Sequence, residues 1–168
     1  MRILGIDPGF GRIGWGIVEK QASDWQVVAY GCIETSAKDD FVSRIDELNK
    51  QLKKIIEEFK PDLSAVEELF FYKNLKTAIK VGQARGVILL TLCQAKIPIE
   101  EFTPLQIKQA LTGYGRAEKT QIQYMVNMIL KLNQKKLQDD AADALAVALT
   151  AGQNLKYREL LNKSKVSG

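Results

Sequence analysis

An apolar segment near the start of the chain ends directly on a carboxylate. Residues 3–6, Ile-Leu-Gly-Ile, predict a buried strand; Asp7 follows it, and Pro8 and Gly9 then force a turn. An unpaired charge is costly to bury, so a core strand that delivers an aspartate to its end needs a partner for that aspartate. This segment constrains both the fold and the chemistry of the chain.

The apolar patterns that follow predict an α/β protein. Residues 14–20 and 25–35 alternate apolar and polar side chains, which favours an antiparallel meander with the first strand. Helices and strands then alternate, which is typical of a mixed sheet. One domain is expected over residues 1–151, and a basic, flexible tail over residues 152–168. Strands are expected at 2–7, 14–20, 25–35, 63–69 and 97–102, and helices at 40–60, 74–95, 104–113, 117–132 and 139–152.

The composition excludes several kinds of chemistry. The 168 residues contain no histidine, which rules out Ser-His-Asp and Cys-His catalysis and histidine metal ligands. Cys32 and Cys93 lack the spacing of a zinc site or a disulfide framework. The apolar runs are too short to span a membrane, and the first residues lack a signal-peptide layout. We therefore expect a cytoplasmic protein without a membrane partner.

A glycine-rich stretch after the first strand has two readings. Residues 9–14, Gly-Phe-Gly-Arg-Ile-Gly, match the G-x-G-x-x-G fingerprint of dinucleotide-binding proteins. That fingerprint needs a helix to begin within it, whereas the residues from Trp15 onward continue as a strand. A tight hairpin is favoured over a nicotinamide or flavin site.

Positive charge is concentrated in the middle of the chain. The net charge is only +4, but residues 73–136 contain 11 lysines and arginines against three acids. A basic face indicates a phosphate-bearing partner such as nucleic acid. A solvated helix surface would explain the same excess, so charge alone leaves both interpretations open.

Acids from three distant segments are predicted to meet. Asp7 and Glu67 end two strands that a helical crossover makes parallel, and sites in such sheets form beyond the carboxyl ends of the strands. Two carboxylates about 5 Å apart repel by roughly 3 kcal/mol at an effective dielectric of 20, so a cation or a proton must lie between them. The motif Asp139-Asp140-x-x-Asp143 begins a helix rich in alanine, which can approach the sheet closely. The alternative is that these aspartates only cap the helix and complement its dipole. Clustered carboxylates without histidine suit Mg²⁺ or Mn²⁺.

Five motifs occur together in a fixed order: GIDPG at residues 5–9, AVEELFFYKN at 65–74, VGQARG at 81–86, QIKQALTGYGRAEKTQIQYMV at 106–126 and DDAADALAVAL at 139–149. With these motifs the chain resembles the RuvC Holliday-junction resolvases over all but the basic tail. The resemblance implies an RNase H-like fold with a five-stranded mixed sheet of order 3-2-1-4-5 flanked by helices. It also implies a homodimer that resolves four-way DNA junctions by paired symmetric nicks in recombination and repair, in partnership with a branch-migration helicase complex.

The same resemblance assigns roles to the acids. Asp7, Glu67, Asp140 and Asp143 match the family's catalytic, metal-binding residues, and the motif selects Asp140 over Asp139, a choice that the helix pattern leaves open. Two Mg²⁺ ions per active site are implied, with Mn²⁺ as a substitute. Hydrolysis through them gives 5′-phosphate and 3′-hydroxyl ends.

The DNA contacts are predicted from basic and aromatic residues. Lys108 and Lys119 match family lysines near the active site, with Lys119 assigned a catalytic role, and Phe70 matches an aromatic residue at the open centre of the junction. Without the motifs, the lysines would be surface residues and Phe70 and Phe71 would complete a buried strand. The helix motif Gly82-x-x-x-Gly86 predicts close packing against the sheet or a partner subunit. The residues predicted to bind DNA are Phe70, Phe71, Tyr72, Lys73, Lys76, Arg85, Lys108, Arg116 and Lys119.

Two other functions are considered. A nucleotide-dependent phosphotransferase of the actin or sugar-kinase type also has an aspartate before a glycine turn, but it needs two domains, for which 168 residues are too few. A non-catalytic protein that binds junctions would keep the fold without cutting DNA.

Overall fold

One five-stranded mixed sheet organises the protein. The computed structural model describes residues 1–22, 24–68, 75–132 and 138–166. The strands lie in the order β3-β2-β1-β4-β5; β1, β2 and β3 are antiparallel, while β4 and β5 run parallel to β1. The predicted order 3-2-1-4-5 is therefore confirmed. The strands are β1 (Arg2–Asp7), β2 (Arg12–Gln21), β3 (Asp24–Glu34), β4 (Leu63–Glu67) and β5 (Ile99–Phe102).

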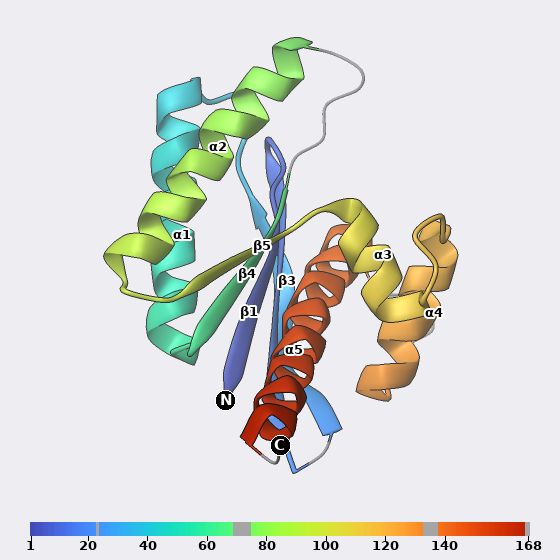
Figure 1. Cartoon of the computed structure of the whole chain (residues 1–168). Helices are drawn as coiled ribbons and strands as arrows, with labels where there is room; N and C mark the ends of the chain where they lie inside the picture. The colour runs from blue at the N-terminus through green and yellow to red at the C-terminus, as the bar shows by residue number, and fades with distance from the viewer. Residues whose placement is uncertain (23, 69–74, 133–137, 167–168) are drawn as a thin grey trace.

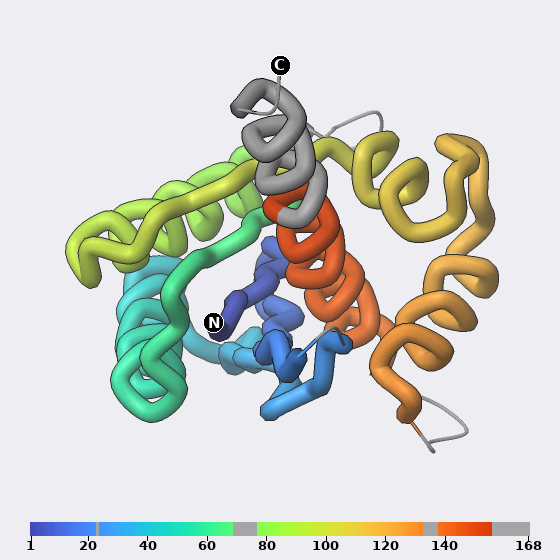
Figure 2. Tube along the Cα trace, turned by 60° about the horizontal axis from the view of Figure 1, so that its bottom comes forward, coloured from blue at the N-terminus to red at the C-terminus, as the bar shows by residue number. Residues whose placement is uncertain are grey.

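Helices cover both faces of the sheet. Helices α1 and α2 pack on one face, and α5 lies across the other face with α3 and α4 beside it (Figures 1 and 2). Local signals fix several ends: the Asp40 side chain caps α1, and a capping box between Thr103 and Gln106 begins α3. The helices are α1 (Phe41–Phe59), α2 (Leu75–Gln94), α3 (Pro104–Thr112), α4 (Lys119–Leu130) and α5 (Asp139–Val166).

The strand period of two divides the core into two layers. In β1, Leu4 and Ile6 face α1 and α2, and Ile3 faces the α5 side; all three are almost completely buried. Because β1 is covered on both faces, its sequence is a continuous apolar run. Asp7 therefore places a carboxylate directly after the four buried residues 3–6 of this strand.

Helix α5 approaches the sheet closely because both surfaces carry small residues. A Cβ atom built on Gly5 would overlap the carbonyl oxygen of Ala144, and one built on Gly14 would overlap that of Asp140. On the helix side, Ala144 and Ala148 are completely buried. The alanines predicted this contact, whereas Gly5 was interpreted only as part of a buried strand and Gly14 only as part of the hairpin. The close contact brings the first turn of α5 to the end of β1.

The glycine-rich stretch forms a hairpin, as predicted. Asp7 pairs with Gly14 across the antiparallel β1–β2 ladder, and β2 begins at Arg12. Gly11 has a φ of 105°, a backbone conformation that side chains disfavour. No helix begins within residues 9–14.

The expected end of the last helix at residue 152 is wrong, because α5 continues as a helix to Val166. The flexibility of the tail stays a prediction. Gly152 was interpreted as the end of the helix. It lies instead against Trp25 of β3, where a Cβ atom would be 2.5 Å from the indole ring. From the sequence alone, a glycine that is needed for close packing inside a helix cannot be distinguished from a glycine that ends a helix. The proposed domain boundary between residues 151 and 152 therefore falls inside α5.

Of the two predicted contacts of Gly82 and Gly86, with the sheet or with a partner subunit, the structure excludes the first. Both glycines lie on an exposed face of α2, and a Cβ atom on either would meet no described atom within 4 Å. Contact with a partner subunit stays a prediction. Within the described ranges, none of the helices combines the length and apolarity required to cross a membrane.

Candidate active site

Asp7 and Glu67 lie side by side at the carboxyl ends of β1 and β4. The preceding residues, Ile6 and Val66, pair in the parallel ladder. The pKa of Asp7 is raised from 3.8 to about 8, first by burial and then by the charges of Glu67 and Asp143 and a hydrogen bond with Glu67. Burial is also the main cause that raises the pKa of Glu67. The site therefore holds more negative charge than its surroundings stabilise.

The first turn of α5 brings further acids to this pair. The charges of Asp140 and Asp143 both raise the pKa of Asp7, so these side chains lie near the end of β1. Burial raises the pKa of Asp143 itself, against the effect of a hydrogen bond from Lys119. Acids from the front, middle and end of the chain therefore act on one another electrostatically, while their role as metal ligands stays a prediction.

The structure distinguishes Asp139 from Asp140. The Asp140 side chain is 32% exposed and its charge acts on Asp7. The Asp139 side chain is 59% exposed and accepts a hydrogen bond of 3.0 Å from Gln123 Nε2. The charge of Asp140 therefore acts on the acid pair, whereas Asp139 faces α4. The motif's choice of Asp140 as a metal ligand stays a prediction.

Two cations contact the acids of α5. Lys119 Nζ lies 2.8 Å from Asp143 Oδ2 and 3.6 Å from Asp139 Oδ2. Partial burial acts to lower the pKa of Lys119, but the hydrogen bond to Asp143 and the nearby carboxylates outweigh it and raise that pKa. Arg12 Nε lies 3.6 Å from Asp140 Oδ2 and 3.0 Å from Glu34 Oε1. Lys119 and Arg12 thus neutralise part of the charge of the site.

The sequence did not indicate Arg12 or Gln123. Arg12 reaches Asp140 because the hairpin returns β2 beside the end of β1, which only the register shows. Gln123 follows Lys119 by four residues, so the helical period could have placed both on the same face of α4.

A cleft of about 190 Å³ opens beside the acids. Glu67 and Asp143 line it together with Lys108 of α3 and Lys119 of α4. Both lysines act on Glu67 by lowering its pKa against the effect of burial. The cleft is completed by the apolar side chains of Pro104, Ile107, Ile122 and Ala146.

The other residues predicted to bind DNA have different positions. Arg116 is exposed in the turn between α3 and α4. Arg85 is ion-paired with Glu101 and donates to the carbonyl oxygen of Glu67, which favours a role in joining α2 to the sheet. Lys76 belongs to α2, but its side chain is outside the described part, and Phe70, Phe71, Tyr72 and Lys73 lie outside the described residues.

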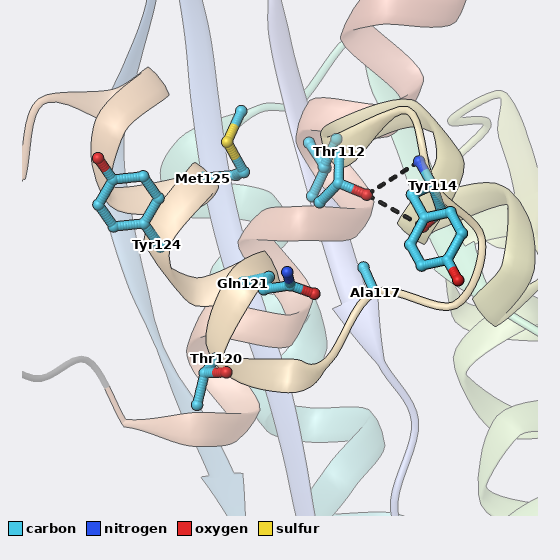
Figure 3. A pocket seen from close by; sticks show the side chains of 8 residues that line it. Thr112, Tyr114, Ala117, Thr120, Gln121, Tyr124 and Met125 are labelled. Atoms are coloured by element: carbon cyan, nitrogen blue, oxygen red, sulfur yellow. Dashed lines mark hydrogen bonds between the residues drawn. The ribbon is translucent and has the colours of Figure 1, made fainter.

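A larger hollow of about 420 Å³ lies between α3 and α4 (Figure 3). Tyr114 and Tyr124 line it and are both exposed, and the Thr112 hydroxyl bonds the backbone of Tyr114. No acid of the site lines this hollow. Its volume is more than twice that of the cleft beside the acids, but the charges and pKa shifts select the smaller cleft.

The donor set fits a hard divalent cation, although the described side chains do not form a closed ligand cage. Within the described ranges, no three acidic or thiol side chains are grouped closely enough to hold a metal ion as they stand. Four carboxylates nevertheless act on one another, and the pKa of Asp7 reports negative charge that a cation would relieve. Carboxylate oxygens are the ligands that Mg²⁺ and Mn²⁺ prefer.

Comparison with known proteins identifies the family. Residues 3–151 match the family described as Crossover junction endodeoxyribonuclease RuvC. The chain belongs to the RuvC family. The RuvC of Petrotoga mobilis is 56% identical over 152 residues, covering 90% of this chain and 93% of the relative. The RuvC of Caldicellulosiruptor saccharolyticus is 54% identical over 150 residues, covering 89% and 90%.

Solved RuvC structures share the fold. Thermus thermophilus RuvC superimposes with a TM-score of 0.85 at 34% identity, covering 94% of this chain and 96% of that chain. The T. thermophilus RuvC in complex with Holliday junction substrate gives a TM-score of 0.87 at 35% identity, with the same coverage. The RNase H-like fold that the motifs implied is therefore confirmed.

Proposed function

We propose that the chain is a structure-selective endodeoxyribonuclease that resolves four-way DNA junctions by paired symmetric nicks in recombination and repair. The observation that carries this proposal is the meeting of Asp7, Glu67 and Asp143 beside a cleft that Lys108 and Lys119 also line. A similar RuvC binds a Holliday junction in its solved complex, which supports the substrate.

The side chains of the cleft have complementary roles. Two Mg²⁺ ions, or Mn²⁺ in their place, would be held by Asp7, Glu67, Asp140 and Asp143 and would supply the charge that activates water and stabilises the leaving 3′ oxygen. Lys108 and Lys119 bind the phosphate, because both ammonium groups border the cleft that contains Glu67 and Asp143. The products are a 5′-phosphate and a 3′-hydroxyl.

The decisive experiment compares labelled four-way and linear DNA, with and without Mg²⁺. We expect paired symmetric nicks in the junction only, and only with Mg²⁺. Asp7→Asn should keep junction affinity and lose cleavage, because it removes a carboxylate without blocking the basic surface. Asp46→Asn, an exposed acid of α1 paired with Lys50, is the matched control and should cut normally. Normal cleavage by Asp7→Asn would contradict the site, and junction binding without any cleavage by the wild type would identify a non-catalytic binder.

Lys119 is the second residue to test. Lys119→Ala should slow cleavage more than it weakens binding, because its ammonium group contacts Asp143 inside the cleft. Single-turnover rates and junction affinity give the two effects separately. Equal losses in cleavage rate and affinity would show that Lys119 only binds the DNA backbone.

The proposal includes a homodimer. Ile79 and Leu90 of α2 are 59% and 57% exposed, and Gly82 and Gly86 lie between them on the same open face of the helix. A two-fold dimer suits a four-way junction because the junction offers two symmetry-related strands. A branch-migration helicase complex is proposed as a further partner, on family resemblance alone, and the cytoplasm as the place of action.

A further inference from the structure

The turn that follows Asp7 carries an aromatic ring that two cations contact. Phe10 stands three residues after Asp7, and its ring lies 4.0 Å from Arg44 Cζ of α1 and 5.1 Å from Lys80 Nζ of α2. The ring of Phe41 supports it at a centroid distance of 5.6 Å. Residues from the hairpin and from both helices of one layer therefore meet at this point.

The guanidinium of Arg44 is held in place by the turn. Arg44 Nε donates to Thr35 Oγ1 at 3.0 Å. Gly11 leaves room for the guanidinium, because a Cβ atom on Gly11 would lie 2.6 Å from Arg44 Nη2. Thr35 and Arg44, with Gly9 and Ala84, surround the same small hollow. The position of this charge is built into the hairpin.

The charge of the pair is not neutralised within the described part of the chain. Some cations of the described residues have a carboxylate partner: Lys50 pairs with Asp46, and Lys131 with Asp24. Arg44 and Lys80 have no carboxylate at ion-pair distance among the described residues, and they share one ring. An aromatic face attracts each exposed cation by only about 0.5–1 kcal/mol, so it orients the pair without cancelling its charge. Two fixed positive charges this close together favour an anion.

We propose that Phe10, Arg44 and Lys80 form a binding site for a backbone phosphate of the DNA substrate. The inference rests on the proposed function. Lys108 and Lys119 approach the acids from the α3–α4 side, whereas Arg44 and Lys80 lie on the α1–α2 side. Both α1 and α2 begin at the end of the sheet where β1 ends (Figure 1). A DNA strand that crosses the carboxyl ends of β1 and β4 is thus held on both sides of the scissile phosphate.

The experiment measures junction affinity as a function of salt, in EDTA so that no DNA is cut. The variants are Lys80→Gln, Arg44→Gln and the double variant, and the control is Lys54→Gln, an exposed lysine near the other end of α1. Each lost phosphate contact should weaken binding on the order of tenfold and reduce the slope of log affinity against log salt by about 1. The double variant should lose about 2 in slope, and Lys54→Gln should match the wild type.

The outcomes separate the two proposals. If the wild type binds and cuts junctions while Lys80→Gln and the double variant keep its affinity and slope, the phosphate site is wrong and the nuclease proposal stands. If the wild type neither binds nor cuts a junction, both are wrong. Lys80 is exposed, so Lys80→Gln tests the site without a change in folding, and thermal unfolding checks the same for Arg44→Gln.

Discussion

Asp7 is a residue whose surroundings disfavour its own charge. Its pKa of about 8 reflects burial first and then the neighbouring acids Glu67, Asp143 and Asp140. A buried acid of this kind costs stability when it is ionised without a cation. The folding of this residue's environment and the binding of a cation are therefore linked.

Without divalent cations, the free energy of unfolding should fall as the pH rises from 5 to 8. In the unfolded chain Asp7 loses its proton near its ordinary value of 3.8, whereas in the folded protein it keeps the proton up to about 8. Between these values unfolding releases a proton, so a higher pH favours unfolding. Urea unfolding in EDTA at several pH values measures the effect.

The control for this pH dependence is a pair of substitutions. Asp7→Asn should flatten the dependence, because amide and protonated carboxyl are both neutral, and Asp46→Asn should retain the slope of the wild type. Mg²⁺ should stabilise the wild type more at pH 8 than at pH 5, since protons compete with the ion at low pH. An Asp7→Asn slope equal to that of the wild type would contradict this account.

Among individual residues, the sequence could predict those site residues whose positions follow from the end of a strand or from the helical period. Asp7, Glu67, Asp140 and Asp143 were predicted, because each stands at the end of a regular element. Arg12, Arg44 and Lys80 were missed as parts of the site. Their contacts depend on the register of the hairpin and on how α1 and α2 pack, and neither is encoded in a local pattern.

Among the elements, α5 has the tightest contact with the sheet. Its alanines lie against glycines of β1 and β2, so that backbone meets backbone with little side chain between them. Such a surface gains stability from close packing and cannot absorb an added methyl group without moving. Because Asp140 and Asp143 begin this helix, any displacement also moves the acids.

Gly5→Ala should destabilise the protein by about 3 kcal/mol or more, because the new methyl group would overlap the backbone of α5 at Ala144 and Ala148. Gly86→Ala is the matched control. Its methyl group would meet no described atom within 4 Å, and the gain in helix propensity should stabilise the protein by up to about 1 kcal/mol. Urea unfolding of both variants checks this. Similar stabilities for the two would show that α5 is not packed as tightly as described.

Element ends were predictable where a side chain or a proline sets them. Asp40 caps α1, Pro61 follows its end, and Thr103 begins α3, all within a residue of the predicted bounds. The end of α5 was not predictable, because Gly152 serves the contact with Trp25 on a distant strand. Local signals thus fail where tertiary packing uses the same residue type.

For the whole molecule, the open face of α2 is the feature that suits a second subunit. Leu90→Glu would bury a charge in that interface, so it should convert a dimer into monomers. Light scattering after size exclusion, over a range of concentrations, measures the mass. Met128→Glu, on α4 and similarly exposed at 58%, is the control and should leave the dimer intact. A stable Leu90→Glu dimer would place the interface elsewhere.

The length of α5 has a practical consequence for experiments on this protein. The acids stand in the first two turns of α5, and its 28 residues extend over about 42 Å. The far end of α5 therefore lies near the start of β1, at the end of the strands opposite the cleft (Figure 1). A fluorophore or affinity tag attached after Gly168 should therefore leave the cleavage reaction unaffected. Handles at the other terminus would begin beside Arg2 and Asp62, where the chain is already tied into the sheet.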